Sequence, residues 1–456
     1  MDQIIKVLYT CSPTSLGFFF RVLLTLSVLE NAVSEYRQKS NVCNQDILDR
    51  SFVTQCSPNI CEPVVEGGPR DDTGEWPSNP NTVVHIQSTR EGDRFKIIKY
   101  AAIDTDEFYY EMSHTNGTIF VDTKTRYQRI LGFGTTLTDS SCTNVDDLTD
   151  DIRVRLIHDY FSPTDGIGLN LIRVPIGSTK YSYSNYVLDQ PEPGQVELTA
   201  YDIDHRIPLI REAHRAAGRL KNRLKLIVSS SSAPPSYKQN NKLTEGGSLK
   251  ADSFDRYASY LNGFVQAYKE RGLATWAVII GENSVSVLKK QQASQLNYNS
   301  MSMTPSDASE LIRSIVRIRE KSPDKVDRYR LLLLGDSRDN IPHWSNKIFV
   351  DPTVRDFVAG VAYRCDMNEF APYDNLAYSI KRYPSKYLLA SESSPNTPIK
   401  LGNWQYAENY ATEIVKNLAS GSVGWIDFNM ALNLQGGPSI NSNYTGKRDN
   451  WASLTY

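Results

Sequence analysis

The sequence has no block of basic residues and almost no excess of either charge. Its 50 Lys and Arg residues stand against 52 Asp and Glu residues, which gives a formal net charge of −2. Domains that bind nucleic acid commonly carry a basic patch or stripe, and none is visible here. We therefore expect no nucleic-acid partner.

Long apolar runs are also scarce. The one candidate, residues 22–29, is too short to span a bilayer because Arg21 interrupts the apolar region just before it. The stretch resembles the core of a secretory signal peptide with cleavage near Ala32 or Ser34, so we assign residues 1–34 to a signal peptide. No later stretch is long and apolar enough to cross a membrane, and the chain is expected in the secretory pathway.

Cysteine is rare, with six in 456 residues. Cys56 and Cys61 are close enough in sequence to close a small loop by a disulfide, which suits an oxidising compartment. Cys43 has no obvious partner. Cys142 and Cys365 lie at the ends of predicted strands, and we expect both to be buried, reduced thiols.

The N-terminal part differs in composition from the rest. Residues 35–92 are rich in Pro, Gly, Asp and Asn and are predicted to be loops, whereas alternating runs between residues 94 and 122 predict antiparallel strands. We group residues 35–122 as one region. Two glycosylation acceptors, Asn116 and Asn443, fit a secreted chain.

The rest of the chain repeats a strand-then-helix pattern eight times. Each apolar run is continuous rather than alternating, which is typical of strands buried on both faces of a parallel sheet. Eight such units predict an α/β fold, a (β/α)8 TIM barrel, over residues 123–430. The predicted strands lie in residues 129–139, 169–178, 224–232, 276–283, 329–338, 358–366, 386–393 and 422–430.

No amphipathic helical pattern follows the eighth run. Residues 431–456 therefore read as a truncated C-terminal segment, without the last outer helix of the barrel. We expect the first and eighth strands to be partly uncovered as a consequence.

Barrels of this kind place their chemistry at the C-terminal ends of the strands. Glu392 ends the seventh predicted strand and Glu282 the fourth, with Ser284 two residues further on. Retaining glycosidases use a nucleophilic carboxylate and a general acid about 5–5.5 Å apart. Glu392 is thus a candidate nucleophile, and a purely structural carboxylate is the alternative.

Five segments in order resemble the landmark motifs of the lysosomal glucosylceramidases, glycoside hydrolase family thirty. They read LGFGTTLTDSS, GLNLIRVPIGS, WAVIIGENSVS, LLASESS and GWIDFNMALNLQGGP. The resemblance implies a barrel with a β-sandwich and retaining hydrolysis of the β-glucosyl bond of glucosylceramide, with no cofactor and no metal. It also implies a saposin-type activator, an acidic lipid surface and a lysosomal or extracellular location. Residues 35–122 would supply a partial sandwich, and its C-terminal strands would be missing.

The resemblance assigns roles to single positions. Glu392 matches the family's nucleophile, and Ser284 stands where the family has its acid/base glutamate. Asn283 matches the residue that bonds the sugar 2-hydroxyl, and Glu282 a supporting carboxylate. The further positions implied in substrate binding are Arg173, Asp139, Trp425, Asp427 and Phe428.

Several pocket positions depart from the family pattern. Lys180 replaces an aspartate that grips the sugar's distal hydroxyls, and Ser231 and Phe428 each replace a tryptophan. Residues 364–366 read Arg-Cys-Asp in place of His-Trp-Tyr. These changes are expected to weaken both catalysis and sugar binding.

A serine hydroxyl cannot act as a general acid at acidic pH, so hydrolysis of natural glucosylceramide is expected to be severely impaired. Without a carboxylate at position 284, and with Arg173 and Lys180 or Arg364 nearby, Glu392 is expected to stay ionised. Three alternatives stay open. The first is an enzyme with unusual acid/base chemistry, with Glu282 as the substitute acid. The second is a non-catalytic homologue that binds glycolipid or an activator, and the third is a truncated, non-functional product.

Overall fold

The computed structural model describes the barrel region and parts of the N-terminal region. The described residues are 7–8, 56–57, 60–61, 82–90, 96–101, 124–164, 166–188, 190, 195–218, 224–284, 296–321, 329–365, 371–393, 404–433 and 436–440. Most of the predicted signal peptide, both glycosylation acceptors and the two strands predicted within residues 107–122 lie outside them.

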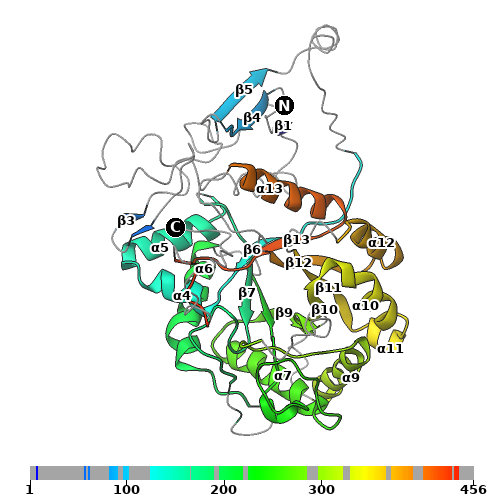
Figure 1. Ribbon diagram of the computed structural model, residues 1–456. Coiled ribbons are helices and arrows are strands. Elements are labelled where there is room, and N and C mark those ends of the chain that lie inside the picture. Colours follow the sequence, from blue (N-terminus) through cyan, green and yellow to red (C-terminus); the bar gives the residue numbers. More distant parts are fainter. Residues whose placement is uncertain are drawn as a thin grey trace.

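Eight parallel strands close into a barrel in the order β10-β11-β12-β13-β6-β7-β8-β9 (Figure 1). Every one of the eight predicted runs overlaps one of these strands, so the TIM-barrel prediction is confirmed. The strands are β6 (Gly132–Thr136), β7 (Leu171–Pro175), β8 (Lys225–Ser229), β9 (Thr275–Ile280), β10 (Arg330–Ser337), β11 (Val358–Cys365), β12 (Tyr387–Ser393) and β13 (Gly424–Asp427).

Helices surround the barrel (Figure 1). The longer ones are α4 (Asp139–Asp146), α5 (Asp150–Phe161), α6 (Ile207–Ala216), α7 (Phe254–Glu270), α9 (Pro305–Lys321), α10 (Ile341–Ile348), α12 (Asp374–Arg382) and α13 (Trp404–Ala419). Short turns add η2 (Asp202–Arg206), η3 (Pro235–Tyr237), η5 (Arg338–Asn340) and α11 (Pro352–Arg355). Thr304 exchanges hydrogen bonds with Asp307 at the start of α9, and Pro305 is the first residue of this helix.

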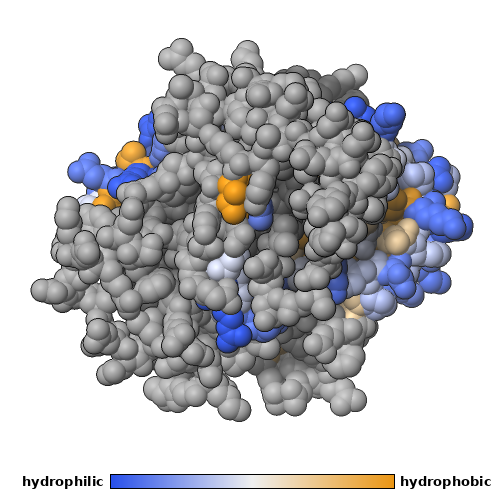
Figure 2. Space-filling model, turned by 90° about the horizontal axis from the view of Figure 1, so that it is seen from above, coloured by the Kyte–Doolittle hydropathy of each residue, from blue (hydrophilic) through white to orange (hydrophobic). Residues whose placement is uncertain are grey.

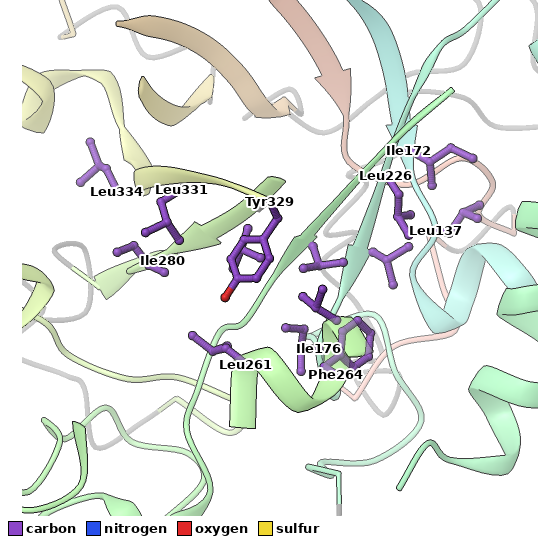
Figure 3. Packing of buried hydrophobic residues seen from close by; sticks show 14 of the residues in the cluster. Leu137, Ile172, Ile176, Leu226, Leu261, Phe264, Ile280, Tyr329, Leu331 and Leu334 are labelled. Atoms are coloured by element: carbon purple, nitrogen blue, oxygen red, sulfur yellow. The ribbon is translucent and has the colours of Figure 1, made fainter. Parts of the chain in front are cut away.

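Two apolar layers explain why the continuous runs form strands. Side chains such as Leu171, Ile227 and Ile279 fill the barrel interior. Their neighbours on the same strands, such as Ile172 and Leu226, belong to a second buried cluster that includes Phe264 of α7 (Figure 3). Because both faces are covered, strand residues are apolar on both faces.

The expectation of uncovered strands is wrong for β6 and β13. Every residue of β6 is buried, and in β13 only Asp427 is partly exposed. In the part of the chain that the structure describes, no helix follows β13. Cover on this side comes instead from α13, whose Tyr410 packs edge-to-face on Trp425 with ring centroids 5.6 Å apart.

Small β-elements occur in the N-terminal region. The strands β1 (Val7–Leu8), β4 (Thr82–Gln87) and β5 (Lys96–Ala101) form one sheet, so β5 confirms a predicted strand. The loop prediction for residues 35–92 is wrong at β4, where the run TVVHIQ is rich in β-branched residues although its neighbours suggest loops. The hairpin of β2 (Cys56–Ser57) and β3 (Ile60–Cys61) pairs Cys56 with Cys61 along the backbone. Their disulfide stays a prediction.

Cys142 and Cys365 are buried and take part in no disulfide, as predicted. Within the described ranges, no helix has both the length and the apolarity needed to cross a bilayer. Where Figure 2 is coloured, hydrophilic residues predominate and hydrophobic ones are interspersed among them. Such isolated hydrophobic residues are ordinary on a protein surface.

Candidate active site

Arg173 connects two carboxylates at the C-terminal end of the barrel. It lies in β7, is 1% exposed, and forms ion pairs through one nitrogen, Nη2, with both Glu282 and Glu392. Its Nη2 is 3.1 Å from Oε2 of Glu392, which lies in β12. The structure thus brings together the predicted nucleophile, the predicted supporting carboxylate and the predicted arginine.

Neighbouring strands hold the Arg173 side chain in place. Its Nε donates a hydrogen bond to Oγ of Ser229, the last residue of β8, at 3.1 Å. Its guanidinium carbon lies 5.4 Å from the ring centroid of Phe428, which follows β13. Phe428 in turn packs edge-to-face on Tyr181 at 5.2 Å. Phe428 therefore lies beside Arg173, and its part in substrate binding stays a prediction.

The two carboxylates differ in charge state. Burial, the largest effect, and the nearby Glu282 together raise the pKa of Glu392 to about 7, against the opposing effect of Arg173, Arg364 and Lys180. Burial alone would also raise the pKa of Glu282, but Arg173 and a hydrogen bond with Glu392 lower it below its ordinary value. At acidic pH, Glu282 is therefore ionised and Glu392 carries a proton.

The expectation that Glu392 stays ionised is thus wrong below about pH 7. The expected cationic neighbours are all present, but Glu282 lies close enough to oppose ionisation of Glu392. A second carboxylate thus acts on Glu392 even though position 284 has none. Two like charges this close favour a single shared proton.

A tight turn after β9 places residues 281–284. Gly281 and Asn283 both adopt positive φ angles, +82° and +56°, which Gly adopts freely and Asn tolerates. Asn283 is partly exposed, and its Oδ1 accepts a hydrogen bond from Nη1 of Arg364 in β11. Ser284 is completely buried, and its hydroxyl donates only a long, 3.5 Å hydrogen bond to the carbonyl oxygen of Glu282.

This geometry limits what Glu282 can do. One nitrogen of Arg173, Nη2, pairs with both the Glu282 carboxylate and that of Glu392, so the arginine occupies the space between the two carboxyl groups. A retaining mechanism needs about 5–5.5 Å between nucleophile and acid so that the glycosidic bond lies between them. Glu282 instead supports Arg173 and is itself reached by the Ser231 hydroxyl at 3.4 Å.

Lys180 contributes a third positive charge near Glu392. Its Nζ lies 5.0 Å from the Tyr181 ring centroid and 5.7 Å from that of Phe428. Arg173 faces the same Phe428 ring. Arg173, Arg364 and Lys180 thus all favour the ionised form of Glu392.

Asp139 belongs to a different buried cluster. It follows β6, and its carboxylate forms an ion pair with the fully buried Arg206. It also accepts hydrogen bonds at 3.2 Å from the Tyr186 hydroxyl. Arg206 pairs in addition with Asp202, to which Tyr268 donates a hydrogen bond of 2.9 Å. Asp139 thus has protein partners that tie α4 to η2 and α7.

Trp425 and Asp427 lie apart from the carboxylate pair. The indole Nε1 of Trp425 donates to Oδ1 of Asp427 at 2.9 Å, and the Tyr410 hydroxyl of α13 donates to the same carboxylate. Burial raises the pKa of Asp427 to about 6. Their contacts join β13 to the outer helix layer rather than to Glu392.

Two site residues were missed by sequence reasoning. Ser229 lies at the end of β8, where strand-end position alone could have identified it. Tyr298 lies in the segment before α9 with no distinguishing pattern, yet Arg364 and Glu392 both act on its ionisation. Among the described residues, no group of three or more His, Cys, Asp or Glu side chains is arranged to hold a metal ion.

Comparison with known proteins agrees with this architecture. Residues 130–448 match the family model described as the glycosyl hydrolase family 30 TIM-barrel domain. The lysosomal acid glucosylceramidase of Mus musculus is 29% identical over 378 residues, covering 80% of this chain and 70% of the mouse protein. The endo-1,6-beta-D-glucanase neg1 of Aspergillus fumigatus is 21% identical, covering 69% of this chain and 64% of that protein.

A solved structure shows the same fold. SrfJ from Salmonella typhimurium aligns with a TM-score of 0.62 and 22% identity, over 70% of this chain and 69% of its own. At that identity the likeness concerns the fold alone.

Proposed function

The chain belongs to glycosyl hydrolase family 30, and from this premise we propose that Glu392 is the nucleophile of a retaining β-glycosidase that lacks its general acid. The observation that carries the proposal is the contrast between two strand ends. At β12, Glu392 is 5% exposed and held by Arg173 at 3.1 Å. At β9, the corresponding position is Ser284, which has no acidic proton to donate.

The substrate class follows from the similarity to glucosylceramidases. We propose glucosylceramide or a related β-glucoside, and hence a place in sphingolipid metabolism. The likeness to a lysosomal enzyme of mouse and the predicted signal peptide support a lysosomal or extracellular location. A saposin-type activator and an acidic lipid surface are the expected partners.

Activity on such a substrate is expected to be very low. The ceramide alkoxide leaves poorly without a proton, and losing general acid catalysis costs about 10²–10⁴-fold in rate. Glu392 must also lose its own proton before it attacks, and its pKa of about 7 leaves it mostly protonated in an acidic compartment. The missing general acid and the protonation of Glu392 both lower the rate of hydrolysis.

The test is intact mass spectrometry after incubation with 2,4-dinitrophenyl 2-deoxy-2-fluoro-β-D-glucoside. Dinitrophenolate departs without acid help, so the reagent examines Glu392 and the sugar site alone. We expect one added fluoroglucosyl unit, on Glu392 by peptide mapping, and no adduct in Glu392→Gln.

Wild-type protein that melts cooperatively but takes up no label would refute the nucleophile assignment. It would leave a non-catalytic role in binding glycolipid or an activator.

A further inference from the structure

Arg364 lies next to the position that lacks a carboxylate. In the barrel it is paired with Glu392 across the β11–β12 ladder. Its Nη1 donates a hydrogen bond to Oδ1 of Asn283, the residue immediately before Ser284. A partly exposed guanidinium is thus held near both the nucleophile and the general-acid position.

A guanidinium and a carboxylic acid help a leaving group in different ways. Arginine does not give up its proton in proteins, so Arg364 cannot protonate an alkoxide. It can stabilise negative charge that develops on a departing oxygen, through charge-assisted hydrogen bonds. A site with Arg364 and Ser284 is therefore suited to a leaving group that is stable as an anion.

Resting on the role proposed for Glu392, we propose that the site takes β-glycosides whose leaving group departs as an oxyanion, and that Arg364 stabilises this oxyanion. The leaving group is a carboxylate, as in a glycosyl ester, or a phosphate. Either is the conjugate base of a strong enough acid to leave without a proton.

The step balances without any other reagent. The ionised Glu392 carboxylate forms a bond to the anomeric carbon, the bond from that carbon to the ester or phosphate oxygen breaks, and its electron pair leaves with the oxyanion. In the second half, an oxyanion acceptor attacks the anomeric carbon and Glu392 regains its electron pair. No base is needed because the acceptor is already deprotonated, so the glycosyl group passes from one oxyanion to another.

The test uses the full chain and three β-D-glucosyl substrates. 1-O-Benzoyl-β-D-glucose releases a carboxylate and β-D-glucose 1-phosphate releases a phosphate. N-(β-D-Glucopyranosyl)pyridinium releases neutral pyridine and also needs no acid. Sodium acetate serves as the acceptor, and kcat/KM is measured for wild type, Arg364→Gln and Lys180→Gln, with cooperative melting of each variant as the check on folding.

We expect Arg364→Gln to lower kcat/KM for the oxyanion substrates by about 100-fold, the usual effect of removing a stabiliser of developing negative charge. The pyridinium substrate has no such charge to stabilise and should lose far less. Lys180→Gln is the matched control, since Lys180 also acts on Glu392 but is held over Tyr181 and Phe428. It should affect all three substrates alike.

Two results would overturn the proposal. One is that wild type turns over neither oxyanion substrate faster than buffer does. The other is that Arg364→Gln lowers the pyridinium reaction by the same factor as the oxyanion reactions. Fluoroglucosyl labelling tests the nucleophile Glu392 separately. If the protein is labelled but gives either of these results, the proposed function stands and the role of Arg364 is refuted. Comparison of the ester with the phosphate identifies which oxyanion is preferred.

Discussion

Restoring a carboxylate at position 284 is the most direct perturbation of the proposed mechanism. If Ser284 occupies the acid/base position, Ser284→Glu should raise kcat/KM for an alkyl glucoside such as octyl β-D-glucoside. General acid catalysis contributes about 10²–10⁴-fold, which corresponds to about 3–5 kcal/mol of transition-state stabilisation.

The structure favours the lower end of that range. Ser284 is fully buried, so a glutamate there must displace its neighbours or turn into the sugar site. Burial raises the pKa of a carboxyl group, which suits an acid, while the nearby Arg364 opposes that rise. We expect a gain of about 100-fold for the alkyl glucoside, because part of the benefit offsets the cost of accommodating the larger side chain.

The assay compares octyl β-D-glucoside with 2,4-dinitrophenyl β-D-glucoside, whose leaving group needs no proton. Only the alkyl substrate should gain from Ser284→Glu. Ser284→Gln is the control of matched size that cannot donate an acidic proton. The reasoning is refuted if the glutamine variant gains as much, or if the glutamate variant is labelled by the fluoroglucoside yet shows no gain on the alkyl substrate.

Two further predictions concern Arg173 and Glu392. Arg173→Leu leaves Glu282 and Glu392 buried without their shared cation, and we expect a loss of about 3–5 kcal/mol in the free energy of unfolding, measured by denaturant titration at pH 8. Adding Glu392→Gln should recover part of that loss, and a loss under 1 kcal/mol in the single variant would contradict the ion-pair interpretation. The rate of fluoroglucosyl labelling should rise with pH and level off above about 7, as Glu392 ionises. Folding raises the pKa of Glu392 from 4.5. The stabilising contribution of Glu392 is therefore complete below about pH 4.5 and is lost as the pH rises through about 7. Over that range, the melting temperatures of wild type and Glu392→Gln should converge or cross.

The barrel could be predicted because its strands are buried on both faces. Continuous apolar runs at regular intervals leave few other folds available, and each of the eight runs overlaps a strand of the barrel. The strand β4 could not be identified in the same way, since its alternating run is short and lies in a segment rich in Pro, Gly and Asn. A run this short shows too little hydrophobic periodicity to distinguish a strand from a loop.

The direction of the Trp425 and Asp427 side chains could have been predicted from the alternation of side chains along a strand. Ile426 belongs to the cluster in the barrel interior, so residues 425 and 427 on the same strand must point to the helix layer. Their contacts with Tyr410 of α13 follow from that parity. Position at a strand end alone does not predict substrate binding, because the direction of the side chain decides whether it faces the site.

The position of Glu282 could not be foreseen from alternation. The fourth predicted strand covers residues 276–283, with Glu282 near its end. The strand instead ends at Ile280, and the positive φ angles of Gly281 and Asn283 turn the chain. Glu282 thereby reaches Arg173 and Glu392, a contact that only the three-dimensional structure reveals.

The charge state of Glu392 connects the pH prediction with the test of Arg364. Both Arg364 and Lys180 favour the ionised form of Glu392, so removing either cation raises the pKa of Glu392 and lowers the fraction of reactive protein at acidic pH. That loss affects every substrate equally and would mimic a general catalytic defect. Above the raised pKa of Glu392 in the variants, the nucleophile is ionised in all of them, and only interactions with the leaving group still distinguish them. The comparison of benzoyl and pyridinium glucosides therefore belongs on the alkaline plateau, where a selective loss in Arg364→Gln can arise only at the departing oxyanion.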